Sequence, residues 1–358
     1  MLNYIIRRIL LMFPTLLGMT LVTFLVMGLS PGGVGGSLLN GAGTMKADVA
    51  RAQREYLERR FGLNQPLLVQ YARWLNEISP IGFAVGPNQK LGAFHWLKKP
   101  DLGYSFSKGR PVLDLVAEAL PITLLLNLIT LPITIVIALA AGIFAARRKG
   151  GILDLTSGII LLGLWSVPTI WAGVMLIGFL ANRQYLYWFP TAGLHDTLAE
   201  TMPFFPQHLA GGWNRGWLAD IGWHLVLPVL CLTYSGFAFL ARLARGATLE
   251  NLSSDYARTA RAKGLDERAI LLRHVLRNSL LPLITYSAGI LPSLFSGAVI
   301  VETIFSIHGM GLLMIDAIRA RDRELVLDEA LVVGFVSLVS YLLADVLYAV
   351  ADPRVSYE

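Results

Sequence analysis

The chain has few charged residues and a single cysteine in its 358 residues. Charged side chains make up 15% of the sequence, hydrophobic residues make up 55%, and the mean hydropathy is +0.59. A soluble core of this size does not need so much apolar material, so the composition indicates a membrane protein. Cys231 cannot form a disulfide within the chain, and its place inside an apolar run predicts a packing role.

The motifs of several enzyme classes are missing as well. Neither a His-Glu-x-x-His zinc motif nor a Gly-x4-Gly-Lys-[Ser/Thr] phosphate loop occurs, so any ATP must bind to another chain. Ser296-Gly297 lacks a glycine two positions before the serine and a later intramembrane histidine to activate it, which disfavours an intramembrane protease. We therefore expect no enzyme activity, cofactor or metal in this chain. The histidines show no ligand spacing: His95, His195, His208, His224, His274 and His308.

Long apolar runs dominate what is present. A bilayer core about 30 Å thick needs about 20 apolar residues per helix. We predict an all-α polytopic bundle of six transmembrane helices, in which the first run is a permanent helix because Pro31-Gly32-Gly33 follows it instead of a cleavage site. The expected divisions are a first helix with a long outward loop (1–117), a helical core (118–350) and a tail (351–358). The six runs are residues 9–29, 118–146, 152–180, 223–241, 282–305 and 329–350.

The formal net charge of +6 is distributed in a way that indicates topology rather than nucleic-acid binding. Arg7-Arg8, Arg147-Arg148-Lys149 and eight Lys or Arg between residues 242 and 281 lie on one side if the N-terminus is inside. The connection over 181–222 on the other side carries only two. The loop over 30–117 holds eleven, which the positive-inside rule permits because long loops translocate largely regardless of charge. Both termini are therefore predicted to be cytoplasmic.

The outward loop and the second apolar run contain further local signals. Apolar residues at near-helical spacing predict two amphipathic helices, one over 49–61 and one over 67–75. The segment over 101–106, which precedes Pro111, predicts a turn that leads back to the membrane. In the second run, Ala138, Gly142 and Ala146 form a small-residue face that favours close helix packing.

A polar, arginine-rich segment between residues 255 and 282 interrupts the apolar sequence. Gly264 suits a helix C-cap, and Asp266 can accept backbone N–H groups at the start of a next helix. That second helix is predicted to run until Pro282. We therefore predict a helical hairpin on the membrane surface.

The spacing Ala260-x-x-x-Gly264, followed by His274, Arg277-Asn278 and Leu280-Leu281-Pro282, resembles the EAA loop of binding-protein-dependent ABC importers, in the form found in peptide and nickel permeases. The resemblance implies a type I permease fold and a first helix that docks on an ATPase subunit. Arg258 stands where the family's glutamate is expected. The alternative is that the basic cluster only orients the chain or meets anionic lipid. The implied coupling residues are Asp255, Tyr256, Arg258, Thr259, Ala260, Arg261, Lys263 and Gly264.

The C-terminal third resembles the same family. Val301-Glu302-Thr303-Ile304-Phe305-Ser306, Gly309-Met310-Gly311 and Asp352-Pro353-Arg354 follow its pattern in order, so the match spans nearly the whole chain. Several short motifs, Trp223-His224-Leu225 among them, look most like the microcin C-type permeases. The resemblance implies transport of short peptides or peptide-like compounds across a bacterial inner membrane, with nickel or a metal chelate as the alternative. The implied partners are a second permease chain, two ATPase chains that hold ATP and Mg²⁺, a periplasmic binding protein and membrane lipid.

Two acidic residues lie in or near the apolar runs, where an isolated charge usually faces a cavity or a partner. Glu302 falls near the outward end of the fifth run, and Asp345 falls in the sixth. Both are candidates for the translocation path. A cap or an interhelical hydrogen bond explains Glu302 equally well, and a structural role is favoured for Asp345.

The charge distribution leads to a direct test of topology. Reporters fused after Lys149 and near Gly264 are expected to give cytoplasmic signals, and fusions at Lys90 and His208 external ones, because basic loops are retained inside. The measurement is paired alkaline phosphatase and fluorescent-protein activity at each site. A cytoplasmic signal at His208 would contradict the six-helix arrangement.

Overall fold

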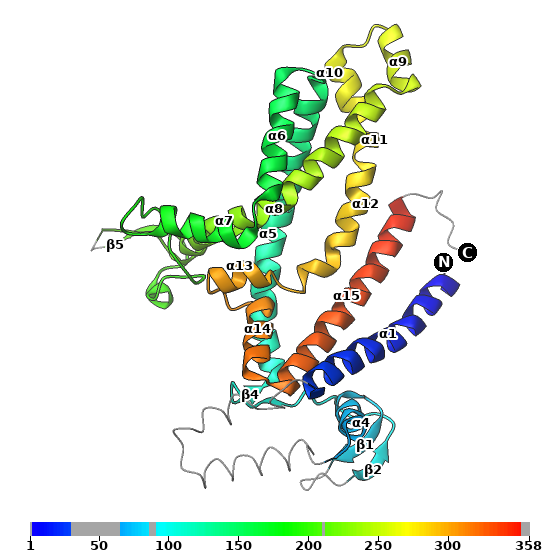
Figure 1. The fold of residues 1–358 in the computed structure, drawn as a ribbon, viewed down its shortest axis with the longest axis vertical. Coiled ribbons are helices and arrows are strands. Elements are labelled where there is room, and N and C mark those ends of the chain that lie inside the picture. Colours follow the sequence, from blue (N-terminus) through cyan, green and yellow to red (C-terminus); the bar gives the residue numbers. More distant parts are fainter. Residues whose placement is uncertain (1, 30–64, 86–90, 210–211, 352–358) are drawn as a thin grey trace. The chain divides into compact units, whose positions relative to one another are not determined.

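A computed structural model describes residues 2–29, 65–85, 91–209 and 212–351, and Figure 1 shows their arrangement along the chain. The chain divides into two compact units. The described residues of the first unit fall within 2–120 and 313–342, and those of the second fall within 121–312 and 343–351. Both are built mainly from helices, and the described residues form three short two-stranded sheets.

In the first unit, one short helix packs against two long helices. Helix α4 (Leu67–Ile78) confirms the second predicted amphipathic helix, and the first, over 49–61, lies outside the described residues. The buried face of α4 carries Tyr71 and Trp74, which pack against Phe24 of α1 (Leu2–Leu29) and Leu327 of α15 (Arg323–Ala351). The rings of Phe24 and Tyr71 meet edge to face at 5.3 Å.

Buried polar contacts fix the orientation of α4 against α15. The Arg323 guanidinium donates to Gln70 (2.7 Å) and Glu324 (3.1 Å), and the Trp74 indole donates to Asp328 (3.0 Å). All five residues are buried. Because a buried charge or indole N–H requires a partner, these bonds fix the orientation of α4 on α15 as well as its position.

Two small hairpins complete the first unit. Strand β1 (Gly82–Val85) pairs antiparallel with β2 (Leu91–His95). The pair β3 (Tyr104–Ser105) and β4 (Arg110–Pro111) confirms the predicted turn before α5 (Val112–Arg147).

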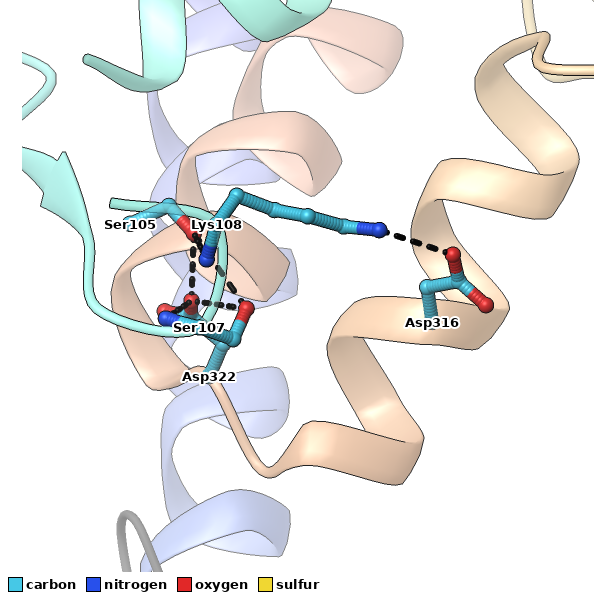
Figure 2. Close-up of polar contacts among 5 residues, drawn as sticks. All are labelled: Ser105, Ser107, Lys108, Asp316 and Asp322. Atoms are coloured by element: carbon cyan, nitrogen blue, oxygen red, sulfur yellow. Dashed lines mark hydrogen bonds and ion pairs between the residues drawn. The ribbon is translucent and has the colours of Figure 1, made fainter. Parts of the chain in front are cut away.

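The β3–β4 turn is fastened to the connection between α14 (Met310–Ala320) and α15, as Figure 2 shows. One oxygen of the buried Asp322 accepts bonds from the Ser105 hydroxyl (2.6 Å), the Ser107 hydroxyl (2.7 Å) and the Ser107 backbone N–H (3.0 Å). Its other oxygen accepts from the Leu325 N–H and so caps α15. Lys108 forms a half-exposed ion pair with Asp316 at 3.0 Å. The turn is thus held mainly by the buried carboxylate.

The second unit contains α5 from Pro121 onward and the elements that follow it as far as α13. Figure 1 shows α7 lying across the direction of α6. The α6–α7 bend is 92° and falls at Val167-Pro168, because proline removes a backbone donor and disfavours a helical residue before it. The elements are α6 (Ile152–Ser166), α7 (Thr169–Leu176), the π-helix η2 (Ile177–Ala181), η3 (Ala199–Thr201), β5 (Gln207–Leu209), β6 (Gly212–Asn214), α8 (Trp217–Leu252), α9 (Asp255–Ala262), α10 (Glu267–Ala269), the π-helix η4 (Ile270–Val275), α11 (Leu276–Ser279), α12 (Leu281–Ile290), η5 (Leu291–Leu294) and α13 (Val299–Ile304).

Fewer helices than the predicted six are long and apolar enough by themselves to cross a bilayer. Within the described residues, four helices are long and apolar enough to cross a bilayer, or five if the bent α6–α7 pair counts as one span. The predicted single helix over 282–305 is wrong. There α12 gives way to a 3₁₀ turn at Pro292, Gly297 has φ +85°, and α13 begins only at Val299. Apolar content alone did not reveal this break.

Helices α5 and α8 approach closely at the predicted small-residue face. Ala138 and Ala146 are buried. A Cβ atom on Gly142 would lie 2.6 Å from the Cβ of Ala244 and 2.7 Å from the carbonyl oxygen of Ala241, both on α8. The two backbones can therefore meet here only because residue 142 has no side chain, which confirms the predicted packing.

Replacing Gly142 tests this contact. Gly142→Ala is expected to lower the free energy of unfolding by about 1–3 kcal/mol, because the added methyl group overpacks the α5–α8 contact. Gly158→Ala on α6 is the matched control, since its Cβ would meet no atom within 4 Å and helical alanine is otherwise favoured over glycine. Thermal unfolding in detergent measures both, and equal melting temperatures for the two variants would contradict the close packing.

Candidate functional site

The predicted hairpin is present between residues 255 and 279. Helix α9 follows the end of α8, and α10, η4 and α11 lead back to α12. Ala257 and Ala260 form the buried face of α9, and they pack against Ile270, Leu271 and Val275 of the returning segment. Two alanines in this position let the arms of the hairpin lie close together.

Gly264 ends α9 as the sequence predicts. Its φ is +78°, a conformation that favours glycine. The Gly264 N–H donates to the Arg261 carbonyl (2.9 Å), and the Leu265 N–H donates to the Ala260 carbonyl (3.3 Å). This pair of bonds is the Schellman motif. A Cβ atom on Gly264 would meet no atom within 4 Å, so a side chain here is opposed by backbone conformation alone.

Side chains brace the turn on both sides. Asp266 accepts from the Arg268 N–H (3.1 Å), which confirms its predicted capping role. Arg261 donates to the Glu267 carboxylate (2.7 Å) and to the Leu252 carbonyl (3.1 Å) at the end of α8. The bond to Glu267 raises the pKa of the Arg261 guanidinium above its ordinary value. Arg261 therefore joins α8, α9 and α10.

The returning arm ends at Ser279, three residues before the predicted stop at Pro282. A separate helix, α12, begins at Leu281, and Pro282 is its second residue, where the missing N–H is not needed. The arm differs from the prediction in that it contains the π-helix η4, which no sequence pattern indicated. The buried Ser279 hydroxyl donates to Val275 within the arm (2.9 Å) and to Ala247 of α8 (3.3 Å).

The outer face of α9 presents most of the predicted coupling residues. Asp255, Tyr256, Arg258, Thr259, Arg261, Lys263 and Gly264 are exposed, whereas Ala260 is buried and serves the packing of the hairpin. The Arg258 side chain is 71% exposed and lies 3.6 Å from the Asp255 carboxylate. A surface pair of this kind contributes little to folding, so the face is available to a partner.

The base of the hairpin is tied to α6 by an ion pair that sequence reasoning missed. Arg245 of α8 makes two bonds of 2.7 Å to the Asp154 carboxylate, which also accepts from the Gly150 N–H (3.0 Å). The bonds to Asp154 raise the pKa of Arg245. Such two-pronged pairs fix geometry well. The two residues are 91 positions apart, so only the fold brings them together.

The two candidate path residues lie in different surroundings. Glu302 is fully buried, and its carboxylate accepts bonds of 3.0 Å from the Thr123 hydroxyl and from the N–H groups of Ala298 and Leu312. Asp345 is partly buried on α15. The contacts of Glu302 fit the capping alternative, and a role in the path stays a prediction for both residues.

Other site types gain no support in the described part of the chain. Groups of three or more His, Cys, Asp or Glu that could hold a metal ion are absent from these residues. The Ser296 hydroxyl donates to the Ser293 carbonyl oxygen at 3.3 Å, and a carbonyl cannot act as the base that a serine nucleophile needs.

Comparison with known families and proteins identifies the class. Residues 138–357 match the family described as binding-protein-dependent transport system inner membrane component, and residues 1–127 match the N-terminal part of such membrane components. The chain belongs to this family of transport permeases, and it is a multi-pass membrane protein.

Individual relatives match along nearly their whole length. The chain is 34% identical to the oligopeptide transport system permease protein AppB of Bacillus subtilis, with 99% of each chain covered. It is 33% identical to the dipeptide transport system permease protein DppB of Alkalihalophilus pseudofirmus, with complete coverage of both. It is 31% identical to the peptidoglycan transport system permease protein YejB of Agrobacterium fabrum, over 99% of this chain and 98% of the relative. The predicted family is thus confirmed.

The Gly264 turn can be tested without reference to function. Gly264→Val is expected to destabilise the hairpin by roughly 1–2 kcal/mol, because a β-branched residue is strained at φ +78°. Gly264→Asn is the matched control, since asparagine tolerates this conformation. Hydrogen–deuterium exchange over residues 255–279 should be faster in the valine variant and nearly unchanged in the asparagine variant. Equal exchange in both variants would contradict the strain argument.

Proposed function

We propose that this chain is the permease subunit of an ATP-driven importer of short peptides or peptide-like compounds, and that the exposed face of α9 docks on an ATPase subunit. The main support for docking is the structure of the hairpin. Its polar face is exposed, whereas its apolar face is buried within the hairpin itself. The names of the oligopeptide, dipeptide and peptidoglycan permeases support the choice of substrate class.

The proposed assembly contains a second homologous permease, two ATP-binding chains that carry ATP and Mg²⁺, and an extracytoplasmic binding protein. The membrane is the bacterial inner membrane, and both termini face the cytoplasm. This orientation requires the broken segment over 282–305 to cross the membrane as well, because the other candidate spans number five at most in the described residues. The basic residues of the hairpin and of the loop after α5 support this orientation.

In the proposed mechanism, closure of the ATPase pair displaces α9, and the braced turn passes the displacement on. Arg261 connects α9 to the end of α8, and Arg245 connects α8 to α6 through Asp154. Because these contacts are directional and the α9 packing is tight, the hairpin and α8 move together. The movement would exchange inward-facing for outward-facing access. Glu302 and Asp345 remain the candidate residues of the path.

Charge reversal on the docking face tests the function. Arg258→Glu should reduce the ATPase that co-purifies with the permease and reduce peptide uptake at least tenfold, because it alters an exposed docking charge with little effect on folding. Arg183→Glu is the matched control, since the predicted topology places that arginine on the opposite side of the membrane. Both variants are compared with wild type at equal membrane abundance.

Measuring the uptake of several compounds distinguishes peptide transport from nickel transport. Dipeptides, longer peptides and nickel are supplied to cells that lack the chain and to complemented cells. Uptake of peptides that depends on this chain would support the proposal, and dependence of nickel uptake alone would favour the metal-chelate alternative.

Unchanged ATPase binding and uptake in Arg258→Glu would contradict docking through the exposed face of α9.

A further inference from the structure

The β1–β2 hairpin of the first unit collects three aromatic rings on one face. Phe83 and Phe94 are directly opposite each other in the strand register, and their rings meet edge to face at 5.3 Å. Trp96 follows Phe94 by two residues, and those two rings lie 5.4 Å apart. Trp96 lies just past the end of β2, and these two ring contacts join the three side chains into a continuous aromatic face.

This aromatic face is open in the structure. Phe83, Phe94 and Trp96 are 43%, 47% and 77% exposed, and Leu97 next to them is 84% exposed. His95 is the neighbour of Phe94 on β2, so its side chain points to the opposite face of the strand. A two-stranded sheet is only marginally stable in water by itself. Contact with α4 supports this hairpin, and its aromatic face remains as apolar surface that a partner would remove from water.

The hairpin is held firmly beside the ends of two candidate membrane spans. The Asn76 side chain at the end of α4 donates to the Phe83 carbonyl (2.9 Å) and accepts from the Phe83 N–H (2.8 Å). Helix α4 in turn packs on Phe24, near the end of α1, and on Leu327, near the start of the span Arg323–Val346. The attachment places the aromatic face near the boundary of the bilayer.

We propose that the aromatic face of the β1–β2 hairpin, formed by Phe83, Phe94 and Trp96, lies in the headgroup region of the bilayer and anchors α4 there. Aromatic rings, tryptophan above all, collect at membrane–water boundaries. Two lysines follow the rings directly: Lys99 is exposed, and the Lys98 ammonium donates to the Asn76 carbonyl within the hairpin's attachment to α4. The exposed Lys99 beside this apolar face suits the phosphates of lipid headgroups, and this favours lipid over a protein partner.

Site-directed spin labelling of the assembled complex in nanodiscs of phosphatidylethanolamine and phosphatidylglycerol tests the proposal. Cys231 is replaced by alanine, and a nitroxide is attached at Phe94→Cys, Trp96→Cys or, as the matched control, His95→Cys. All three positions are exposed, so the label does not disturb the core. Collision with oxygen, which concentrates in lipid, is compared with collision with a water-soluble nickel chelate.

The expected result is a higher accessibility to oxygen than to the chelate at positions 94 and 96, and the reverse at position 95. Equal access of the chelate to all three positions would overturn the proposal and place the hairpin in water. Protection of 94 and 96 from both reagents, or protection that begins only when the binding protein is added, would also overturn it and assign the face to a protein partner.

Discussion

Hydrocarbon offers no hydrogen-bond partners, so every break in a helix of this chain needs a substitute donor or acceptor. The clearest substitute is the Glu302 carboxylate, which accepts the N–H groups of Ala298 and Leu312 where the helical path is interrupted. The Thr123 hydroxyl donates to the same carboxylate and accepts the Met310 N–H. The sharp course of residues 296–312 depends on this one buried acid and its hydroxyl partner. Without them, several backbone groups would be buried and unsatisfied.

The path of residues 296–312 also depends on close contacts between backbone segments, which glycine makes possible. A Cβ atom on Gly309 would lie 2.7 Å from the Glu302 carboxylate and 2.5 Å from the Thr123 hydroxyl. A Cβ atom on Gly311 would lie 2.7 Å from the backbone N and Cα of Val299. The glycines leave room for the polar contacts, and the polar contacts hold the glycine-rich segment in place. An apolar sequence interrupted by such residues forms a compact turn rather than another straight span.

Local chemistry was predicted well from the sequence, and contacts between distant segments were not. Gly264 and Asp266 act within a few residues of themselves, so their capping roles followed from residue type and position. The break over 282–305 was missed because its stabilising partner, Thr123, lies 179 positions before Glu302. The Arg245–Asp154 pair was missed for the same reason. The roles of the exposed α9 residues depend on a partner's surface, which a single chain cannot specify.

Helix α8 is continuous, so its contact with α5 at Gly142 can act as the pivot of a lever. At 1.5 Å per residue, the 36 residues of α8 span roughly 54 Å. The contact at Ala241 divides this length into about 16 Å toward the hairpin and about 36 Å toward the other end. A rod that pivots at such a point acts as a lever with arms in a ratio of roughly one to two. A displacement of about 2 Å at the hairpin end would therefore appear as about 4 Å, in the opposite direction, at Trp217.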